Sequence, residues 1–336
     1  MLDSLGSGTD LEQILTLSLL DPNQDRFLGL FYESTPLKIK KNTSIHLHVL
    51  QIENGDFIVE RLFTQLANNS LSYVLTRRSL EILKNDPSRM VEFVNKVQTQ
   101  FRAPDARAGE GGELILYSFL EGHLRAPKLL SKMDLKTSPN HYVYGSDGIH
   151  LLQEADGRFQ VIYGESKMYG DTAGKIGSSI RRGIEAAFES VSEVRDNGFG
   201  FEEWLVDSNL LKEIADQEKL DALVSILLPT PSGSAVQKSN AFGIFVGFEI
   251  DVTSFPFADL DHSEIESRLR HLALDAIEGE KSTIENEIQH RDLGGYPLHV
   301  YLVPFLKRRV NGEIRGIENI RRDLAYRLSR KTSKHA

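Results

Sequence analysis

The stretch that decides the fold is GSDGIHLLQEADGRFQVIYGESK, residues 145–167. Its apolar and β-branched residues predict two strands, Gly145–Leu152 and Arg158–Glu165, joined by a turn at Ala155-Asp156-Gly157. The flanking elements are a strongly apolar helix at Glu113–Leu124, a short strand at Leu129–Leu135, and a helix with core-facing residues Ile176, Ile180, Ile184, Ala187, Val191 and Val194. Residues 109–194 are therefore predicted as helix, three strands and helix, in an α/β (α+β) fold.

Charged side chains gather at the ends of the two predicted strands. Asp147 lies at the start of one, and Glu165 and Lys167 end the other. Because side chains alternate along a strand, Glu165 and Lys167 point one way and Ser166 points the other. Two carboxylates and one ammonium would then meet at one sheet edge. Carboxylate oxygens are the ligands that a hard cation such as Mg²⁺ prefers. The lysine ammonium can orient an attacking hydroxide or stabilise the negative charge of a phosphate.

Each of these residues also has an ordinary interpretation. Asp147 taken alone is typical of a turn in a Gly-Ser-Asp-Gly loop. Glu165 and Lys167 alone are typical of a surface salt bridge. The ordered set of helical glutamate, strand aspartate and strand Glu-x-Lys, spread over residues 110–167, favours the metal site and a phosphodiester substrate.

The predicted helix before these strands carries acidic residues along one stripe. Glu110, Glu113, Tyr117 and Glu121 recur at three- and four-residue intervals. Carboxylates on an apolar helix are costly to bury unless they are paired or bound to a metal. We therefore expect Glu113, and with it Glu110, to hold a metal. For Glu110, stabilisation of the helix dipole is an equally good interpretation.

Composition narrows the class of protein. The chain has 336 residues, of which 40% are hydrophobic and 26% charged, as in globular proteins. It has no cysteine, which excludes disulfides and cysteine-based zinc sites. The N-terminus lacks the features of a signal peptide, and no apolar run reaches the length of a membrane span. We therefore expect a cytoplasmic protein without a membrane partner.

The formal net charge of −9 argues against general affinity for nucleic acid. A nuclease needs only a local basic groove, however, and two basic stretches qualify. The first follows the Glu-x-Lys strand and contains Lys175, Arg181 and Arg182. The second runs from Lys307 to Lys331, and a solvated helix face is its favoured interpretation.

Hydrophobic patterning predicts the remaining elements. They are a short helix at Leu11–Leu20, strands at Ile45–Leu50, Ser70–Leu75, Leu223–Leu228, Ala241–Ile250 and Leu298–Phe305, helices at Ser79–Phe101 and Ser263–Gln289, and a closing helix within Gly312–Thr332. Asp86-Pro87-Ser88 is expected to divide the helix at 79–101. His46 and His48 share one face of a predicted strand, as a pair of metal ligands would. The sequence shows no third ligand for them, so a structural role is favoured.

The ordered motifs resemble those of the PD-(D/E)xK nuclease superfamily and, more narrowly, the HamA family of Hachiman anti-phage defence. The resemblance rests on Gly109–Tyr117, Gly145–His150 and Gly164-Glu165-Ser166-Lys167, and it is strongest over residues 100–195. It implies a restriction-endonuclease-like core, with a central mixed sheet flanked by helices and with N- and C-terminal elaborations. One departure is that Asp147 follows a serine where the superfamily motif has proline.

The resemblance also implies a function. HamA-like proteins are bacterial DNA-degrading effectors that use Mg²⁺, with Mn²⁺ as a substitute, and a superfamily-two helicase, HamB, restrains them. The motif carboxylates map to Glu113 (with Glu110), Asp147 and Glu165, and the motif lysine maps to Lys167. In this mapping Asp147 and Glu165 bind the metal, together with the backbone carbonyl after Glu165. Lys167 orients the water, and Glu113 holds a second metal or a water on the first.

The basic stretch after the motif would contact the DNA backbone through Lys175, Arg181 and Arg182. Two other functions remain open: a non-catalytic interaction subunit with a nuclease-like fold, and a site-specific restriction subunit. We expect residues 1–100 to form a partner-binding N-terminal elaboration, residues 101–225 the nuclease core, and residues 226–336 an α/β continuation packed on that core.

Overall fold

The computed structural model describes residues 25–39, 42–104, 109–131, 133, 146–199 and 238–331. Its helices are α1 (Asp25–Leu28), α2 (Val59–Val74), α3 (Arg77–Asn85), α4 (Met90–Gln100), α5 (Glu110–Gly122), α7 (Ser178–Asp196), α11 (His262–Glu278), α12 (Lys281–His290) and α13 (Ile317–Ser329). The strands are β1 (Thr35–Lys38), β2 (Thr43–Leu47), β3 (Ile52–Glu53), β4 (Asp56–Phe57), β5 (Lys128–Ser131), β6 (Gly148–Gln153), β7 (Phe159–Met168), β8 (Lys238–Asp251), β9 (Leu298–Val310) and β10 (Glu313–Arg315).

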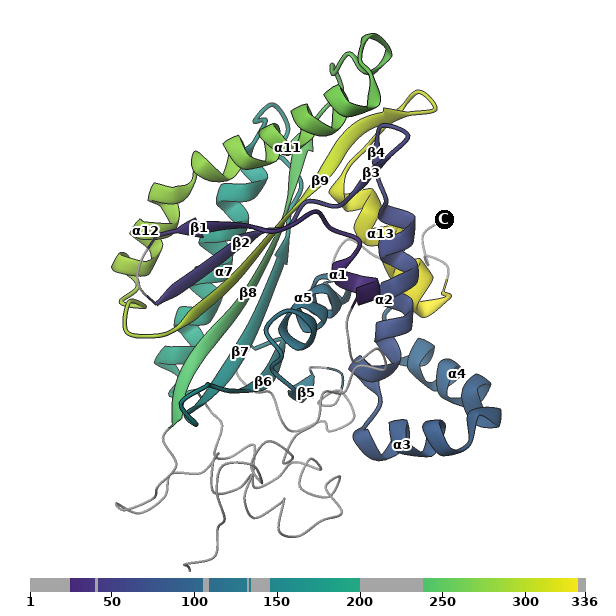
Figure 1. Cartoon of the computed structure of the whole chain (residues 1–336), viewed down its shortest axis with the longest axis vertical. Coiled ribbons are helices and arrows are strands. Elements are labelled where there is room, and N and C mark those ends of the chain that lie inside the picture. Colours follow the sequence, from purple (N-terminus) through teal and green to yellow (C-terminus); the bar gives the residue numbers. More distant parts are fainter. Residues whose placement is uncertain are drawn as a thin grey trace, which may run out of the picture.

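One mixed sheet organises these elements (Figure 1). Its strand order is β1-β2-β9-β8-β7-β6-β5, and β10 pairs with β9. The inner strands β2, β9, β8 and β7 run parallel, whereas β1, β6 and β5 pair antiparallel with their neighbours. Helices α5, α2 and α13 lie on one side of the sheet, and α7, α11 and α12 lie on the other. The expected mixed sheet flanked by helices is confirmed.

Burial explains why the inner strands are apolar along their whole length. Residues 241–250 of β8 are all buried, because helices cover both faces of the parallel part of the sheet. Helix α5 is buried at every position except Gly111, since it lies between the sheet and α2. A helix that is apolar all round is expected in such an interior position.

The order α5, β5, β6, β7, α7, β8 reproduces the predicted core and its further strand. β6 and β7 form an antiparallel pair in which Gly148 lies opposite Gly164. β8 then pairs in parallel with β7. The division of the chain into three parts, at residues 100 and 225, stays a prediction. The sheet contains strands from each of these three parts.

Several predicted boundaries need correction. Ser70–Leu75 is not a strand, because residues 70–74 complete α2 and Leu75 is its C-cap. Its buried Asn69 bonds to Ser118 of α5 at 2.9 Å, so polar residues interrupt the apolar pattern without ending the helix. The helix predicted at 263–289 is two helices, α11 and α12. The helices predicted at 79–101 are confirmed as α3 and α4.

Ile176 was wrongly placed on the buried face of α7. It is 79% exposed, because Gly177 adopts φ of 78° and the helix begins only at Ser178. The segments Leu11–Leu20 and Leu223–Leu228 lie outside the described residues. None of the described helices is both long and apolar enough to cross a membrane.

We predict that Gly183→Ala destabilises the fold. A methyl group at residue 183 would lie 2.6 Å from Cγ1 of Val246, which is fully buried in β8. Alanine gains about 1 kcal/mol in helix propensity, but overpacking of a core costs about 1–3 kcal/mol. Urea denaturation should therefore show a net loss of stability. In Gly294→Ala no neighbouring atom lies within 4 Å of the new methyl, so that matched variant should stay within about 0.5 kcal/mol of wild type.

A second prediction concerns His150, a buried residue of β6. Burial lowers the pKa of His150 to about 3, from an ordinary 6.5, and its Nδ1–H donates to the carbonyl of Ala126 at 2.9 Å. Between pH 6.5 and 3 this histidine is protonated in the unfolded chain and neutral in the folded chain. This histidine therefore lowers the free energy of unfolding by about 1.4 kcal/mol for each pH unit of acidification.

Replacing His150 by asparagine should remove this contribution. The slope of unfolding free energy against pH, measured between pH 6 and 4.5, should become shallower by about 1.4 kcal/mol per unit. The exposed His271 of α11 provides a matched His→Asn control. An unchanged slope in His150→Asn would contradict the assignment of the acid sensitivity to this residue.

Candidate functional site

Asp147 is fixed across the β6–β7 pair by three hydrogen bonds. Its own N–H donates to the carbonyl of Gly164 at 2.8 Å. Its Oδ2 accepts from the backbone N–H of Ser166 at 2.9 Å and from the Ser166 hydroxyl at 2.8 Å. The carboxylate is 8% exposed. The side chain predicted as a metal ligand is therefore held in one orientation at the end of the strand pair.

Glu165 and Lys167 lie on the same side of β7, as strand alternation predicts. The Nζ of Lys167 is 2.6 Å from Oε1 of Glu165, whose side chain is 6% exposed. Burial opposes the charged form of Lys167, yet the pKa of this lysine is raised, because Glu165, Tyr169 and Asp147 favour the ammonium. Lys167 is therefore a cation at neutral pH, within the electrostatic reach of both strand carboxylates.

Ser166 connects this group to helix α5 on the other face of β7. A methyl group on Gly112 would lie 3.3 Å from the Ser166 Oγ, a tight contact, so the glycine lets the first turn of α5 pack closely on Ser166. The serine was not singled out from the sequence, because alternation turns it away from Glu165 and Lys167. Its role is to position Asp147, and only the tertiary contact reveals it.

The helical glutamates lie in the first turn of α5, beside Gly112. Glu110 is 6% exposed and accepts from the N–H of Arg102 at 2.8 Å, with the Arg102 Nε 3.7 Å away. Glu113 is 7% exposed and accepts from the hydroxyl of Tyr73, in α2, at 3.0 Å. Both carboxylates also stabilise the N-terminus of α5 through its dipole.

The structure thus pairs Glu165 with Lys167 and places Asp147 within electrostatic reach of that lysine. Among the described residues, the ligand atoms of Glu113, Asp147 and Glu165 do not all fall within 4.8 Å of one another. The only triad that meets this criterion in the described part consists of His46, His48 and His123. A direct role of Glu113 and Glu110 at the metal stays a prediction.

Two further carboxylates organise the loop between Lys167 and α7. Asp171 accepts from the N–H groups of Gly177 and Ser179 at 2.8 and 2.9 Å, which caps the start of α7. Glu249, in β8, accepts from the N–H groups of Asp171 and Ile317, each at 2.7 Å. Backbone donors hold both carboxylates, so their role is to fix the loop that follows the Glu-x-Lys motif.

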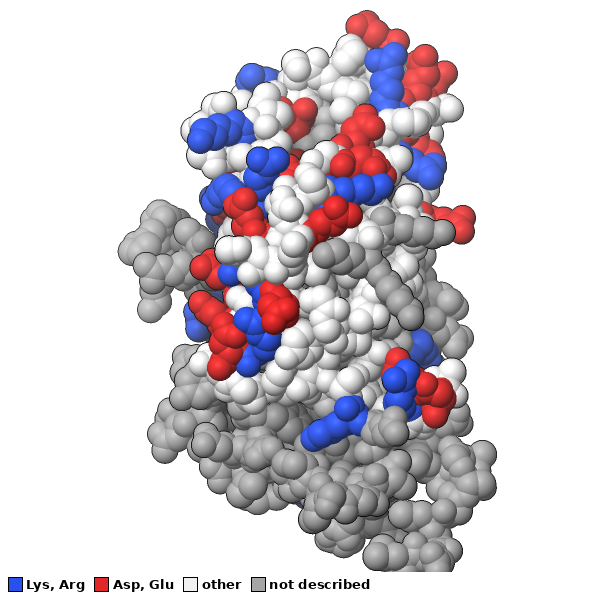
Figure 2. All heavy atoms as spheres, turned by 90° about the vertical axis from the view of Figure 1, so that its left-hand side faces the viewer, with Lys and Arg blue, Asp and Glu red and all other residues white. Residues whose placement is uncertain are grey.

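The basic residues of this loop and of α7 have different environments. Arg181 pairs with Glu280 at 3.0 Å. Arg182 lies over the ring of Tyr169 and donates to the carbonyl of Gly170 at 3.2 Å. Lys175 is exposed. On the face that carries α12, basic and acidic side chains are interspersed over the described surface (Figure 2), so this face is not a broad basic patch.

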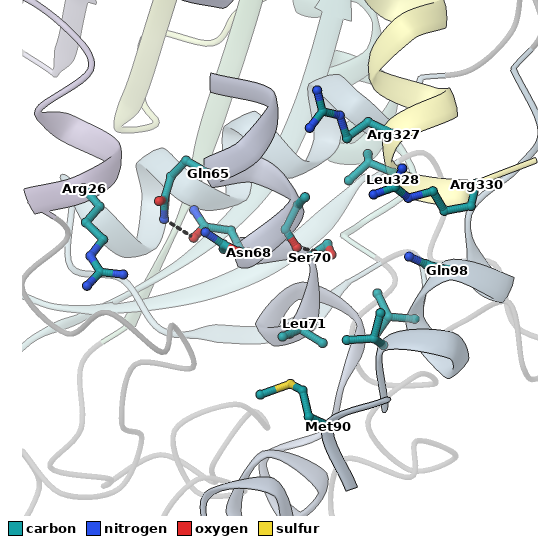
Figure 3. A pocket seen from close by; sticks show the side chains of 14 residues that line it. Arg26, Gln65, Asn68, Ser70, Leu71, Met90, Gln98, Arg327, Leu328 and Arg330 are labelled. Carbon is teal, nitrogen blue, oxygen red and sulfur yellow. Dashed lines mark hydrogen bonds between the residues drawn. The ribbon is translucent and has the colours of Figure 1, made fainter. Parts of the chain in front are cut away.

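A polar pocket lies elsewhere, among α2, α4 and the end of α13 (Figure 3). Its volume is about 580 Å³, and its lining includes Arg26, Gln65, Gln98, Arg327 and Arg330. Arg327 pairs with Glu60 at 2.6 Å. The described residues of the lining include no carboxylate and no histidine, so they offer no alternative metal centre.

One protein-family model matches most of the chain. The HamA family model matches residues 25–311 of 336, from α1 to the end of β9. The chain belongs to the HamA family. Membership in HamA assigns it to anti-phage defence and agrees with the nuclease-like fold. No curated protein and no solved structure matches the chain.

We predict that Tyr73→Phe destabilises this HamA protein by about 1–3 kcal/mol, because the buried Glu113 carboxylate loses a hydrogen-bond donor. Urea denaturation would measure the change. Tyr296→Phe is a matched control at a partly buried ring that packs on Phe242. Equal stability of the two variants would contradict a contribution from the Tyr73–Glu113 hydrogen bond.

Proposed function

We propose that this chain is a Mg²⁺-dependent DNA endonuclease that acts as the effector of an anti-phage defence system. The observation that supports the proposal is the Glu165–Lys167 pair on β7, with Asp147 held at the adjoining end of the strand pair and favouring the charged form of Lys167. Membership in the HamA family supports the setting in defence. The order of helix, three strands, helix and parallel strand supports a nuclease core.

The residues present fit a hard divalent cation. Asp147 and Glu165 offer carboxylate oxygens, which Mg²⁺ prefers, and both are at least nine-tenths buried. Two carboxylates and one ammonium carry a net charge of −1, and a buried charge is costly unless a cation offsets it. Bound there, Mg²⁺ would polarise the scissile phosphate and lower the pKa of a coordinated water.

The side chains of the site would bind the ion and orient the attacking water. Asp147 and Glu165 would hold the ion, and Ser166 would keep Asp147 aimed at it. Lys167 would donate to the attacking water and offset the negative charge that develops on the phosphorus-bound oxygens. As the water oxygen bonds to phosphorus and gives up a proton to solvent, the bond to the leaving sugar oxygen breaks and that oxygen takes up a proton from solvent. Glu113 would bind a second ion, or a water on the first.

DNA would approach over the loop after β7. Lys175 is exposed there. Arg182 is held against this loop by its contacts with the ring of Tyr169 and the carbonyl of Gly170. Arg181 would contact a phosphate only by sharing or leaving Glu280. Contacts of this kind position the backbone of the duplex without reading its sequence.

The proposal includes restraint by a superfamily-two helicase of the HamB type. Its support is the family membership, together with the toxicity that an unrestrained nuclease would have. Co-expression of the two chains should lower plasmid degradation relative to the nuclease alone. Co-purification of the helicase should persist in Glu165→Gln, because this substitution changes the catalytic group and leaves the outer surface intact.

We predict that Asp147→Asn, Glu165→Gln and Lys167→Ala each reduce Mg²⁺-dependent cleavage of plasmid DNA by at least about 100-fold. The reason is the loss of a metal ligand in the first two variants and of the water-orienting cation in the third. EDTA should abolish cleavage by the wild type. Thermal unfolding of each variant would show whether the fold is retained.

Arg158→Ala is the matched control. Arg158 forms an exposed ion pair with Asp156 at the opposite end of the same strand pair, so its removal should leave cleavage unchanged. Discrete fragments from unrelated DNAs would instead indicate a site-specific restriction subunit. No cleavage by the wild type, with or without the helicase, would indicate a non-catalytic interaction subunit.

A further inference from the structure

Three histidines from distant parts of the chain meet beneath the C-terminal end of α5. His46 lies in β2, and His48 follows two residues later, with its N–H donating to Leu302 of β9 at 2.9 Å. Both therefore face the same side of the sheet. His123 is the residue that ends α5. One ring nitrogen of each histidine lies within 4.8 Å of one from each of the others.

Hydrogen bonds occupy one ring nitrogen of His46 and one of His123. Ser44 Oγ lies 2.7 Å from Nε2 of His46, and the Tyr301 hydroxyl lies 3.3 Å from Nδ1 of His123. The buried Nδ1 of His46 and the buried Nε2 of His48 have no hydrogen-bond partner among the described residues. Buried polar atoms are normally paired, so two such atoms within one histidine cluster suggest a missing ligand.

The surroundings keep the three rings neutral. His48 is only 3% exposed and packs against Phe119, with ring centroids 4.6 Å apart. Burial, together with His123 and His46, lowers the pKa of His48 to about 3. Burial also lowers the pKa of His46 and of His123. Neutral imidazoles keep the lone pairs that a metal ion needs.

We propose that His46, His48 and His123 form a binding site for Zn²⁺ or a related transition-metal ion. Three imidazoles and no carboxylate favour Zn²⁺, Co²⁺ or Cu²⁺ over Mg²⁺, which prefers oxygen. Zinc–nitrogen bonds of about 2.1 Å in tetrahedral geometry place nitrogens about 3.4 Å apart, so the rings would close by at most about 1.4 Å. Ser44 and Tyr301 would orient the ligands through their second nitrogens.

This site is separate from the proposed nuclease centre. Glu110 begins α5, and His123 follows the last turn of this helix, 13 residues away. That length corresponds to about 20 Å of helix. The ion would join β2, near the start of the described chain, to the helix that carries Glu110 and Glu113. It would thereby hold the end of α5 against the β2–β9 part of the sheet.

The test uses the untagged full-length protein, stripped with EDTA and then titrated with Zn²⁺ against a chromophoric chelator. We expect one Zn²⁺ per chain, a higher melting temperature with Zn²⁺, and the intense visible absorption of tetrahedral Co²⁺ when cobalt replaces zinc. His123→Gln and His48→Gln should each weaken Zn²⁺ binding by at least about 100-fold. This loss is larger than the one expected when a residue that only hydrogen-bonds to a ligand is removed. Tyr301→Phe should weaken it by about 10-fold.

His271→Gln, on the exposed face of α11, is the matched control and should bind Zn²⁺ like wild type. Asp147→Asn should also retain the zinc site while losing DNA cleavage, which separates this proposal from the nuclease proposal. Less than one bound Zn²⁺ per wild-type chain, or equal binding by His123→Gln, would overturn it. If a histidine variant fails to fold, the Co²⁺ spectrum of the wild type decides alone, and its absence would show a purely structural histidine cluster.

Discussion

The register of β6 against β7 is the constraint on which the proposed active site depends. Asp147 bonds to Gly164 through its backbone and to Ser166 through its carboxylate. A shift of one residue would turn Glu165 and Lys167 toward α5 and move Ser166 away from Asp147. Gly112 in the first turn of α5 adds a second constraint, because it lets the helix pack closely on Ser166 and Met168 of β7. Strand pairing and helix packing therefore specify the same arrangement.

Much of this arrangement is readable from the sequence, since it depends on local patterns. Alternation along residues 145–167 predicts the strand pair and the shared side of Glu165 and Lys167, and the all-apolar segment predicts that α5 is buried. The errors arise where tertiary contacts override the pattern. Residues 70–75 continue α2 because its buried polar side chains bond to α5. Ser166 and His123 gain their roles only through contacts with residues far away in sequence.

Helix α5 links the two chemical features of the molecule. Its first turn carries the buried Glu110 and Glu113, and its last residue is followed by His123 of the histidine cluster. The two ends favour different chemistry, oxygen donors at one and nitrogen donors at the other. The helix is buried between the sheet and α2, and it packs against both. Its position is therefore shared by both features.

The pairing of β2 with β9 affects the order in which the sheet can assemble during synthesis. β2 pairs with β1 and with β9, and β9 begins only at Leu298. A growing polypeptide therefore holds β2 in a two-stranded hairpin, which is marginally stable in water, until β9 has left the ribosome. The strands that carry Asp147 and Glu165 emerge before β9 does. Products of translation interrupted between these strands would contain Asp147 and Glu165 without the full sheet, so the proposed nuclease would gain its supporting fold only after β9 is made.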